Sequence, residues 1–165
     1  MTFKRKASGS WTDIATTIKR RASGAWKDID LVKRRASGAW TVVWRRVNLT
    51  AQEVVNSVVV GNPIAGYRLN TSGIVESLKN TTYATLGTWL TVGTASNYEC
   101  RATLNSGTLT SGTTGSWLSL GSSREWTVQQ VGVGTNTCNL TIEVRNASTL
   151  VTLASVTVII TADRF

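Results

Sequence analysis

Three copies of one short motif fill the first 43 residues and constrain the fold more than any other feature of the sequence. Each copy has three cations, then Ala-Ser-Gly, one small residue and a tryptophan. The copies begin at Lys4, Lys19 and Lys33, and their tryptophans lie 15 and then 14 residues apart. An internal repeat of this kind predicts a repeated structural unit, which must be identified before the rest of the chain is interpreted.

The residues around each Ala-Ser-Gly predict a β-hairpin. Glycine adopts positive φ without steric cost and serine bonds to nearby backbone, so the three residues are a turn signal between β-favouring neighbours. We expect loops of three or four residues and hairpins joined end to end as a meander. Because Trp26 is out of phase with Ile29 and Leu31, we expect a bulge or a kink between them. The expected strands are near 11–20, 26–35 and 40–48.

The net positive charge of the chain lies entirely within residues 1–46, which contain the repeats. Residues 1–46 hold twelve Lys or Arg and three Asp, a net charge of +9, whereas residues 47–165 hold six cations and six acids. A basic segment of this kind is a candidate for an acidic protein surface, a nucleic acid or a membrane. The alternative explanation is that outward cations keep short strands soluble and guard their edges.

The tryptophans and cations of the repeats are the candidate contact residues. A hairpin alone is marginally stable, whereas stacked repeats bury one another's aromatic faces, so we expect the arm to need a partner. Large flat rings dominate the energy of such contacts, and the cations steer docking. The predicted protein-interface residues are Trp11, Trp26, Trp40, Trp44, Lys4, Arg5, Lys6, Lys19, Arg20, Arg21, Lys33, Arg34 and Arg35.

Two other interpretations of the repeats stay open. The Arg-Arg-Ala-Ser sequences that end at Ser23 and Ser37 resemble the sites of basophilic kinases, although turn chemistry already explains these serines. Cations interleaved with tryptophans can also follow a single-stranded nucleic acid by charge and stacking. Aromatic residues at repeat spacing are more often structural, so nucleic-acid binding is the less favoured alternative.

Residues suited to catalysis or metal binding are sparse. The chain has no histidine, the commonest general base and metal ligand, and its two cysteines are 38 residues apart. The nine acids are scattered, and Glu99 and Glu143 fall on outward strand faces where cross-strand pairing explains them. We therefore predict a protein that is not an enzyme and that has no cofactor and no metal site.

Residues 50–165 carry the signals of a β-sandwich. The composition changes to Thr, Ser, Gly, Val and Asn, and short strand patterns recur between turn signals. Alternation predicts inward faces made of Tyr98, Cys100, Ala102 and Leu104, of Cys138, Leu140, Ile142 and Val144, of Trp126 and Val128, and of Val156, Val158 and Ile160. The expected strands are near 53–60, 65–70, 73–78, 86–92, 97–104, 116–120, 124–131, 137–145 and 150–162.

Cys100, Trp117 and Cys138 follow the order of the Cys, Trp and Cys of immunoglobulin domains. Both cysteines face inward, so a bridge between them is geometrically conceivable. We favour free thiols, because the start of the sequence lacks the pattern of a secretory signal and the cytosol disfavours oxidation. No apolar run is long enough to span a bilayer.

Two groups of residues resemble structural proteins of tailed bacteriophages. The stretches AGYRLNTSGIVES from Ala65, YECRATLNSGTLTSGTTGSWLSLGSSREWTV from Tyr98, LTIEVRN from Leu140 and LASVTVIITA from Leu153 are similar to a small immunoglobulin-like domain of such proteins. The repeats are similar to short basic SGxW repeats of phage tail and fibre proteins. The resemblance implies a multimeric virion component without catalytic chemistry.

These observations predict an all-β protein, with a β-hairpin or meander repeat arm at residues 1–49 and an immunoglobulin-like β-sandwich at residues 50–165. The resemblance implies a virion protein, assembled in the host cytoplasm, of the tail, tail tip or fibre attachment. Its arm would anchor it to other virion structural proteins and to further copies of itself within the particle, without a membrane. A capsid decoration protein is one alternative, and a nucleic-acid-binding accessory protein is another.

Overall fold

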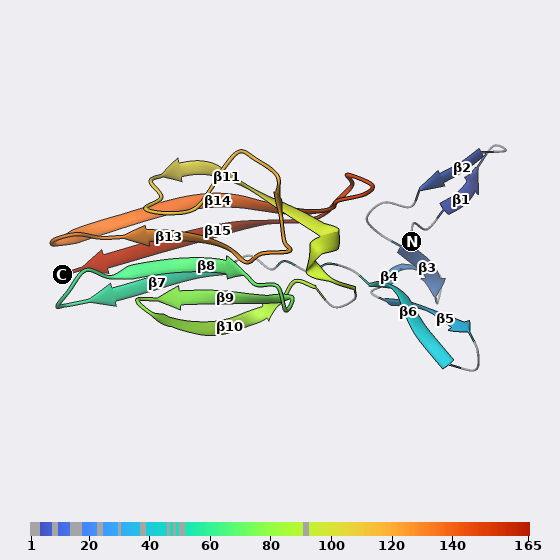
Figure 1. Ribbon diagram of the computed structural model, residues 1–165, viewed down its shortest axis with the longest axis horizontal. Helices are drawn as coiled ribbons and strands as arrows, with labels where there is room; N and C mark the ends of the chain where they lie inside the picture. The colour runs from blue at the N-terminus through green and yellow to red at the C-terminus, as the bar shows by residue number, and fades with distance from the viewer. Residues whose placement is uncertain are drawn as a thin grey trace.

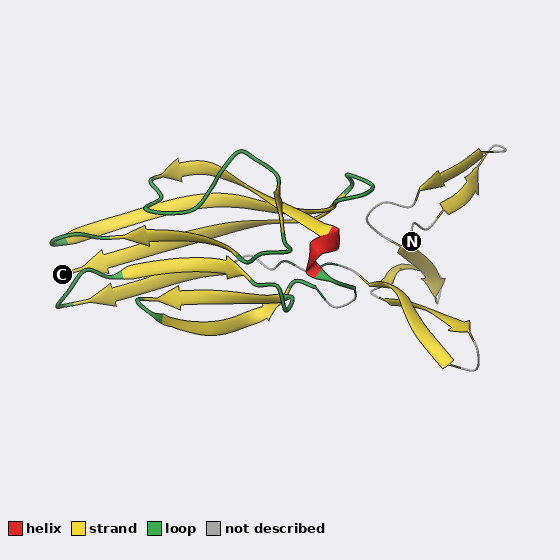
Figure 2. Ribbon diagram, viewed as in Figure 1, coloured by secondary structure: helices red, strands yellow, loops and turns green. Residues whose placement is uncertain are grey.

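A computed structural model describes the backbone of six short strands within residues 4–45 and, in full, residues 47, 49, 52–90 and 93–165. Apart from one short 3₁₀ turn at Ala95–Asn97, every regular element described is a strand (Figure 1 and Figure 2). The predicted all-β class is therefore confirmed.

Residues 52–164 form two sheets that pack face to face as a β-sandwich (Figure 1). The strand orders are β10-β9-β8-β13 in one sheet and β12-β11-β14-β15-β7 in the other. Among these neighbours all pairs are antiparallel except β7 and β15, which run parallel. The strands are β7 (Gln52–Val58), β8 (Ile64–Leu69), β9 (Ile74–Lys79), β10 (Thr82–Thr88), β11 (Tyr98–Gly107), β12 (Leu118–Ser119), β13 (Arg124–Gln129), β14 (Gly134–Asn146) and β15 (Thr152–Arg164).

Each of the nine strands predicted for this region is present, and the largest error in a boundary concerns β10. The sequence predicts this strand at 86–92, whereas it begins at Thr82 and ends at Thr88. The chain leaves the ladder there because the backbone N–H groups of Trp89 and Leu90 both donate to the Gly73 carbonyl. The Trp89 side chain is fully buried, and its indole N–H donates to the Asn70 carbonyl at 2.9 Å.

The core of the sandwich lies between the two sheets. Tyr67 and Trp126 are buried from one sheet, while Leu140, Ile142 and Val158 are buried from the other. The predicted inward faces of β13, β14 and β15 are confirmed, since each of their members named above is buried. This alternation buries one face of each sheet, and apolar burial is the main stabilising contribution to the fold.

The predicted inward face of β11 is right for Cys100 and Ala102 and wrong for Leu104. Cys100 and Ala102 are buried, but Leu104 is 39% exposed. Residues 103–107 are all exposed, and the register shifts between Leu104 and Ser106, so the facing sheet does not cover this end of the strand. Val47 and Leu49 are buried with the same core, although they precede the predicted division at residue 50.

Each repeat forms one antiparallel hairpin. The predicted loop length within a hairpin and the predicted pairing between hairpins are both wrong. Ala7 pairs with Ser10, so two residues separate the last paired positions where three or four were expected. Each hairpin is a separate two-stranded sheet, because the strands described do not pair between copies as a meander would. The strands are β1 (Lys4–Ala7), β2 (Ser10–Asp13), β3 (Ile18–Ala22), β4 (Ala25–Ile29), β5 (Leu31–Ala36) and β6 (Ala39–Arg45).

The bulge expected between Trp26 and Ile29 is also absent from the β3–β4 ladder, whose register runs without a shift from Ala25 to Ile29. Ile29 ends one hairpin, and Leu31 begins the next. Trp26 and Ile29 therefore lie on opposite faces of β4, and no bulge within the strand brings them to one face. The predicted turn serines and glycines at 8–9, 23–24 and 37–38 lie outside the described residues.

Candidate interaction surface

The three hairpins share one register around their tryptophans. In each copy the third cation lies directly across the ladder from the tryptophan. The pairs are Lys6 with Trp11, Arg21 with Trp26, and Arg35 with Trp40. Directly opposed residues share a face of a two-stranded sheet, so each hairpin places a cationic residue and a tryptophan on the same face.

The other two cations of each motif fall on different faces of the hairpin. The first cation is two residues before the third and so shares the face of the tryptophan, whereas the middle arginine falls on the opposite face. The first cations pair as Lys4 with Asp13, Lys19 with Asp28, and Lys33 with Val42. The middle arginines pair as Arg5 with Thr12, Arg20 with Lys27, and Arg34 with Thr41.

A bulge in the third hairpin changes the position of Trp44. Lys33 pairs with Val42 and Val32 pairs with Trp44, so Val43 is the extra residue. The bulge places Trp44 on the face opposite Trp40, where an unbroken ladder would have placed it on the same face. Sequence reasoning missed this division, because the run from Trp40 to Trp44 gives no turn signal inside the strand.

The predicted contact residues thus have known positions in the backbone. Their side chains lie outside the described residues. The contacts proposed for Trp11, Trp26, Trp40 and Trp44 and for the nine cations therefore stay a prediction.

The outer face of the larger sheet of the sandwich carries a ladder of paired charges. Arg101 lies opposite Glu143 in the register, and their side chains form an ion pair at 2.6 Å; Arg145 and Glu99 form another at 2.8 Å. The cross-strand pairing predicted for Glu99 and Glu143 is confirmed. The guanidinium carbons of Arg101 and Arg145 lie 4.7 and 4.0 Å from the ring centre of Trp117.

Trp117 therefore does not have the role that the immunoglobulin pattern predicts for it. It is half-buried on this outer face, while among the tryptophans whose side chains are described the fully buried ones are Trp89 and Trp126. The reason is local: residues 108–117 lead into the short strand β12, which pairs with the edge of β11 beside the two arginines. Alternation of Glu and Arg on β11 and β14 was the sequence signal for this cluster.

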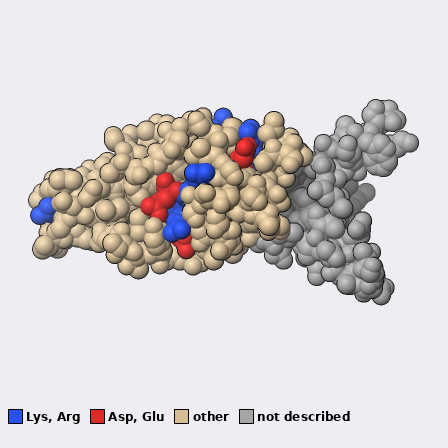
Figure 3. All heavy atoms as spheres, in the orientation of Figure 1, with Lys and Arg blue, Asp and Glu red and all other residues tan. Residues whose placement is uncertain are grey.

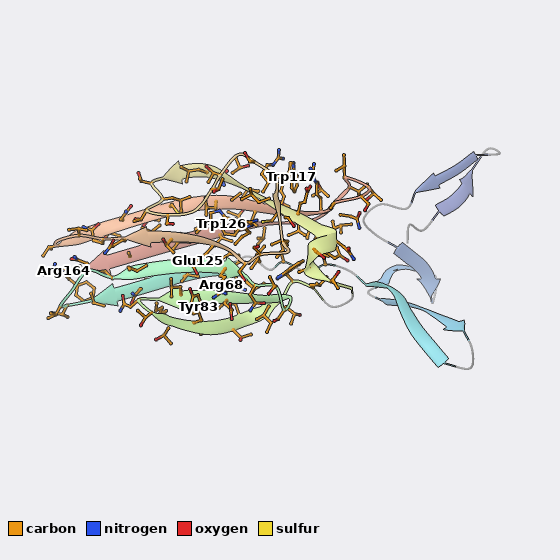
Figure 4. All side chains as sticks on the ribbon, viewed as in Figure 1. Arg68, Tyr83, Trp117, Glu125, Trp126 and Arg164 are labelled. Carbon is orange, nitrogen blue, oxygen red and sulfur yellow. The ribbon has the colours of Figure 1, made fainter. Side chains whose placement is uncertain are left out.

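A second charged cluster lies on the outer face of the smaller sheet, where Figure 4 shows Arg68, Tyr83 and Glu125 next to one another. The Tyr83 hydroxyl donates to Glu125 at 2.7 Å, and the Arg68 guanidinium lies 4.6 Å from the Tyr83 ring centre. The hydrogen bond to Glu125, with a contribution from burial, raises the pKa of Tyr83. Arg68 also forms an ion pair with Glu76 at 3.5 Å.

The two cysteines are free and buried, as the sequence predicts. The conceivable bridge between them is ruled out by the register. Cys100 pairs with Val144, and Cys138 lies six residues before Val144 on β14. At about 3.3 Å per residue the cysteines are about 20 Å apart, whereas a disulfide needs Cα atoms within about 7 Å. Burial raises the pKa of Cys100 to about 12 and that of Cys138 to about 11.

A polar cavity of about 250 Å³ lies beside β13, lined by Ser111, Gly112, Thr113, Leu118, Ser123, Arg124, Glu125 and Trp126. It is smaller than the 300–1,000 Å³ typical of small-molecule sites, so we assign no ligand to it. Within the described part of the chain, no cluster of three or more His, Cys, Asp or Glu residues suits a metal ion. None of the described helical residues forms a helix that could cross a membrane.

Comparison of the chain with known proteins gives no match. No protein-family model matches the chain, and neither a curated protein nor a solved structure is significantly similar to it.

Proposed function

We propose that this chain is a non-enzymatic structural protein of a tailed-phage virion, in the tail, the tail tip or the fibre attachment. Residues 50–165 would be an immunoglobulin-like domain, and the hairpin arm would anchor it to other virion proteins and to further copies of the chain. The observation that carries the proposal is the common register of the three hairpins. It gives each copy the same pairing of a cation with a tryptophan residue.

A repeated unit of this kind suits anchoring rather than catalysis. Aromatic residues and arginine are enriched at the energetic centres of protein interfaces, and charges around them steer docking. Three linked units also bind more tightly than one, because the second and third contacts form within an already bound chain.

The sandwich supports the proposal through its neutral outer surface. Its six cations and six acids balance, and on the face seen in Figure 3 the charged atoms gather in mixed groups on a mostly uncharged surface. The parallel pairing of β7 with β15, beside the antiparallel β11–β14–β15 strands, is compatible with an immunoglobulin-like topology.

The test is quantitative mass spectrometry of virions purified from cells that supply either the wild-type chain or a Trp26→Ala, Trp40→Ala variant. We expect the wild type to remain in purified particles at a fixed copy number and the variant to be lost. A matched Trp117→Ala variant, changed in the sandwich, should be retained. Equal retention of the wild type and the arm variant would contradict anchoring by the arm.

The copy number separates the remaining alternatives. A copy number that matches closed rings fits a tail or fibre position, whereas one that matches the lattice of the head fits a capsid decoration protein. Absence from particles, together with tight binding of an oligonucleotide at physiological salt, would favour the nucleic-acid-binding alternative.

A further inference from the structure

The register divides the nine cations of the three repeated motifs into groups that lie opposite different residues. The first lysines of the first two copies lie across from Asp13 and Asp28 on the tryptophan face. Across from the middle arginines lie Thr12, Lys27 and Thr41, which offer no carboxylate. The middle position is also arginine in all three copies, whereas the third position is Lys in one copy and Arg in two.

Small residues occupy the rest of the arginine face near each turn. Ala7 and Ser10 pair with each other there in the first hairpin, and the equivalent pairs are Ala22 with Ala25 and Ala36 with Ala39. These positions share the face of the middle arginine by alternation. Arginine is the residue whose planar guanidinium can donate two parallel hydrogen bonds to one carboxylate.

The second hairpin carries an additional sign of an anionic partner. Arg20 and Lys27 are directly opposed in its register. Like charges directly opposite each other destabilise a two-stranded sheet. An anion bound on this face would remove that repulsion.

We propose that Arg5, Arg20 and Arg34 form three corresponding docking sites for carboxylates of an acidic protein surface, on the hairpin face opposite Trp11, Trp26 and Trp40. This inference rests on the proposed anchoring role and names the chemistry of its partner. The tryptophan face then packs against neighbouring structure, and the arginine face determines which surface the arm selects.

The placement of the aromatic residues favours an acidic protein over a nucleic acid. Binding of a single strand combines charge with stacking on one surface. In the third hairpin Trp44 shares the face of Arg34. Among the described residues of the first two hairpins, no aromatic residue shares the face of the middle arginine, and the tryptophan faces carry Asp13 and Asp28. These carboxylates would repel phosphates where a base would have to stack.

The experiment uses the full chain and two labelled probes of equal charge, a polyglutamate peptide and an oligo-dT strand. One variant combines Arg5→Gln, Arg20→Gln and Arg34→Gln; its matched control combines Lys4→Gln, Lys19→Gln and Lys33→Gln. Both remove three charges from the same strands, so a general loss of charge or of folding would affect both alike. We expect the arginine variant to bind polyglutamate about tenfold more weakly and the control less than about threefold more weakly.

A third variant, which combines Arg5→Lys, Arg20→Lys and Arg34→Lys, tests the geometry of the contact. It retains the charge but loses the planar fork, so we expect it to bind polyglutamate several-fold more weakly than the wild type. Equal losses for the arginine and lysine variants would overturn the proposal. So would tighter binding of oligo-dT than of polyglutamate by the wild type. Because no virion is needed, failure of this inference is distinguishable from failure of the virion assignment.

Discussion

The hairpin arm and the β-sandwich use the same element, a pair of antiparallel strands, but the arm also places like charges opposite each other. On β11 and β14 the register places Arg101 against Glu143 and Arg145 against Glu99, so the charges neutralise each other across the ladder. In the arm, by contrast, Arg20 lies against Lys27. Cross-strand register thus decides whether neighbouring charges neutralise or repel each other.

The largest expected effect tests whether the arm and the sandwich are independently stable. Trp126→Ala removes a fully buried indole and its hydrogen bond to the Thr113 carbonyl, so we expect a loss of about 3–5 kcal/mol in the free energy of unfolding. Trp26→Ala in the arm should change it by less than about 0.5 kcal/mol. Urea denaturation followed by near-UV circular dichroism measures both. Similar losses would mean that the arm and the sandwich unfold as one unit.

Alkaline pH should destabilise the sandwich through its buried thiols. The pKa of Cys100 is about 12 in the folded chain and 9.0 ordinarily. A raised pKa means that the contribution to stability is complete below about pH 9 and is lost as the pH rises toward the folded value. Between about pH 8 and about pH 10.5 we expect the wild type to lose about 1–2 kcal/mol more than a Cys100→Ala variant.

Urea titrations of both proteins at the two pH values check this expectation. Any cavity left by the alanine is present at both pH values and cancels in the difference. Parallel pH dependence of the two proteins would show that the Cys100 thiol ionises without unfolding the chain. The arm has no cysteine and no tyrosine in residues 1–46, so this sensitivity belongs to the sandwich.

The smallest expected effect compares two arginines directly. Arg145→Ala breaks the pair with Glu99 and the contact with Trp117, both partly shielded from water, and should cost about 1 kcal/mol in the free energy of unfolding. Arg21→Ala in the arm should cost the sandwich nothing measurable. A double-mutant cycle between Arg145 and Trp117 separates the ring contact from the ion pair. No coupling in that cycle would show that the ring contact contributes no stability.

The strands of the sandwich were predictable because a period of two between turn signals is a local pattern. The same alternation predicted the buried thiols of Cys100 and Cys138 and the pairing of Glu143. It could not predict which strands are neighbours, and so it left a bridge conceivable between cysteines that are far apart on adjoining strands. Local patterns also predicted a hairpin in each repeat.

The candidate surface was only partly predictable, because local patterns do not determine the register of a strand pair. The motif identified the tryptophans and cations, but their division between two faces depends on register, and one inserted residue reverses the faces. The bulge at Val43 does this for Trp44. The order of Cys100, Trp117 and Cys138 matches a pattern in which the tryptophan is buried, but the neighbours of Trp117 in space are Arg101 and Arg145.

The parallel pairing of β7 with β15 has a mechanical consequence. β7 is the first strand of the sandwich and β15 the last, and seven residue pairs from Gln52–Val158 to Val58–Arg164 join them. Tension between the beginning of β7 and the end of β15 pulls the two strands along their length in opposite directions. The hydrogen bonds between them then bear the load together in shear, instead of opening one after another. A domain held at the beginning of β7 and pulled at the end of β15 would therefore resist separation of these two strands.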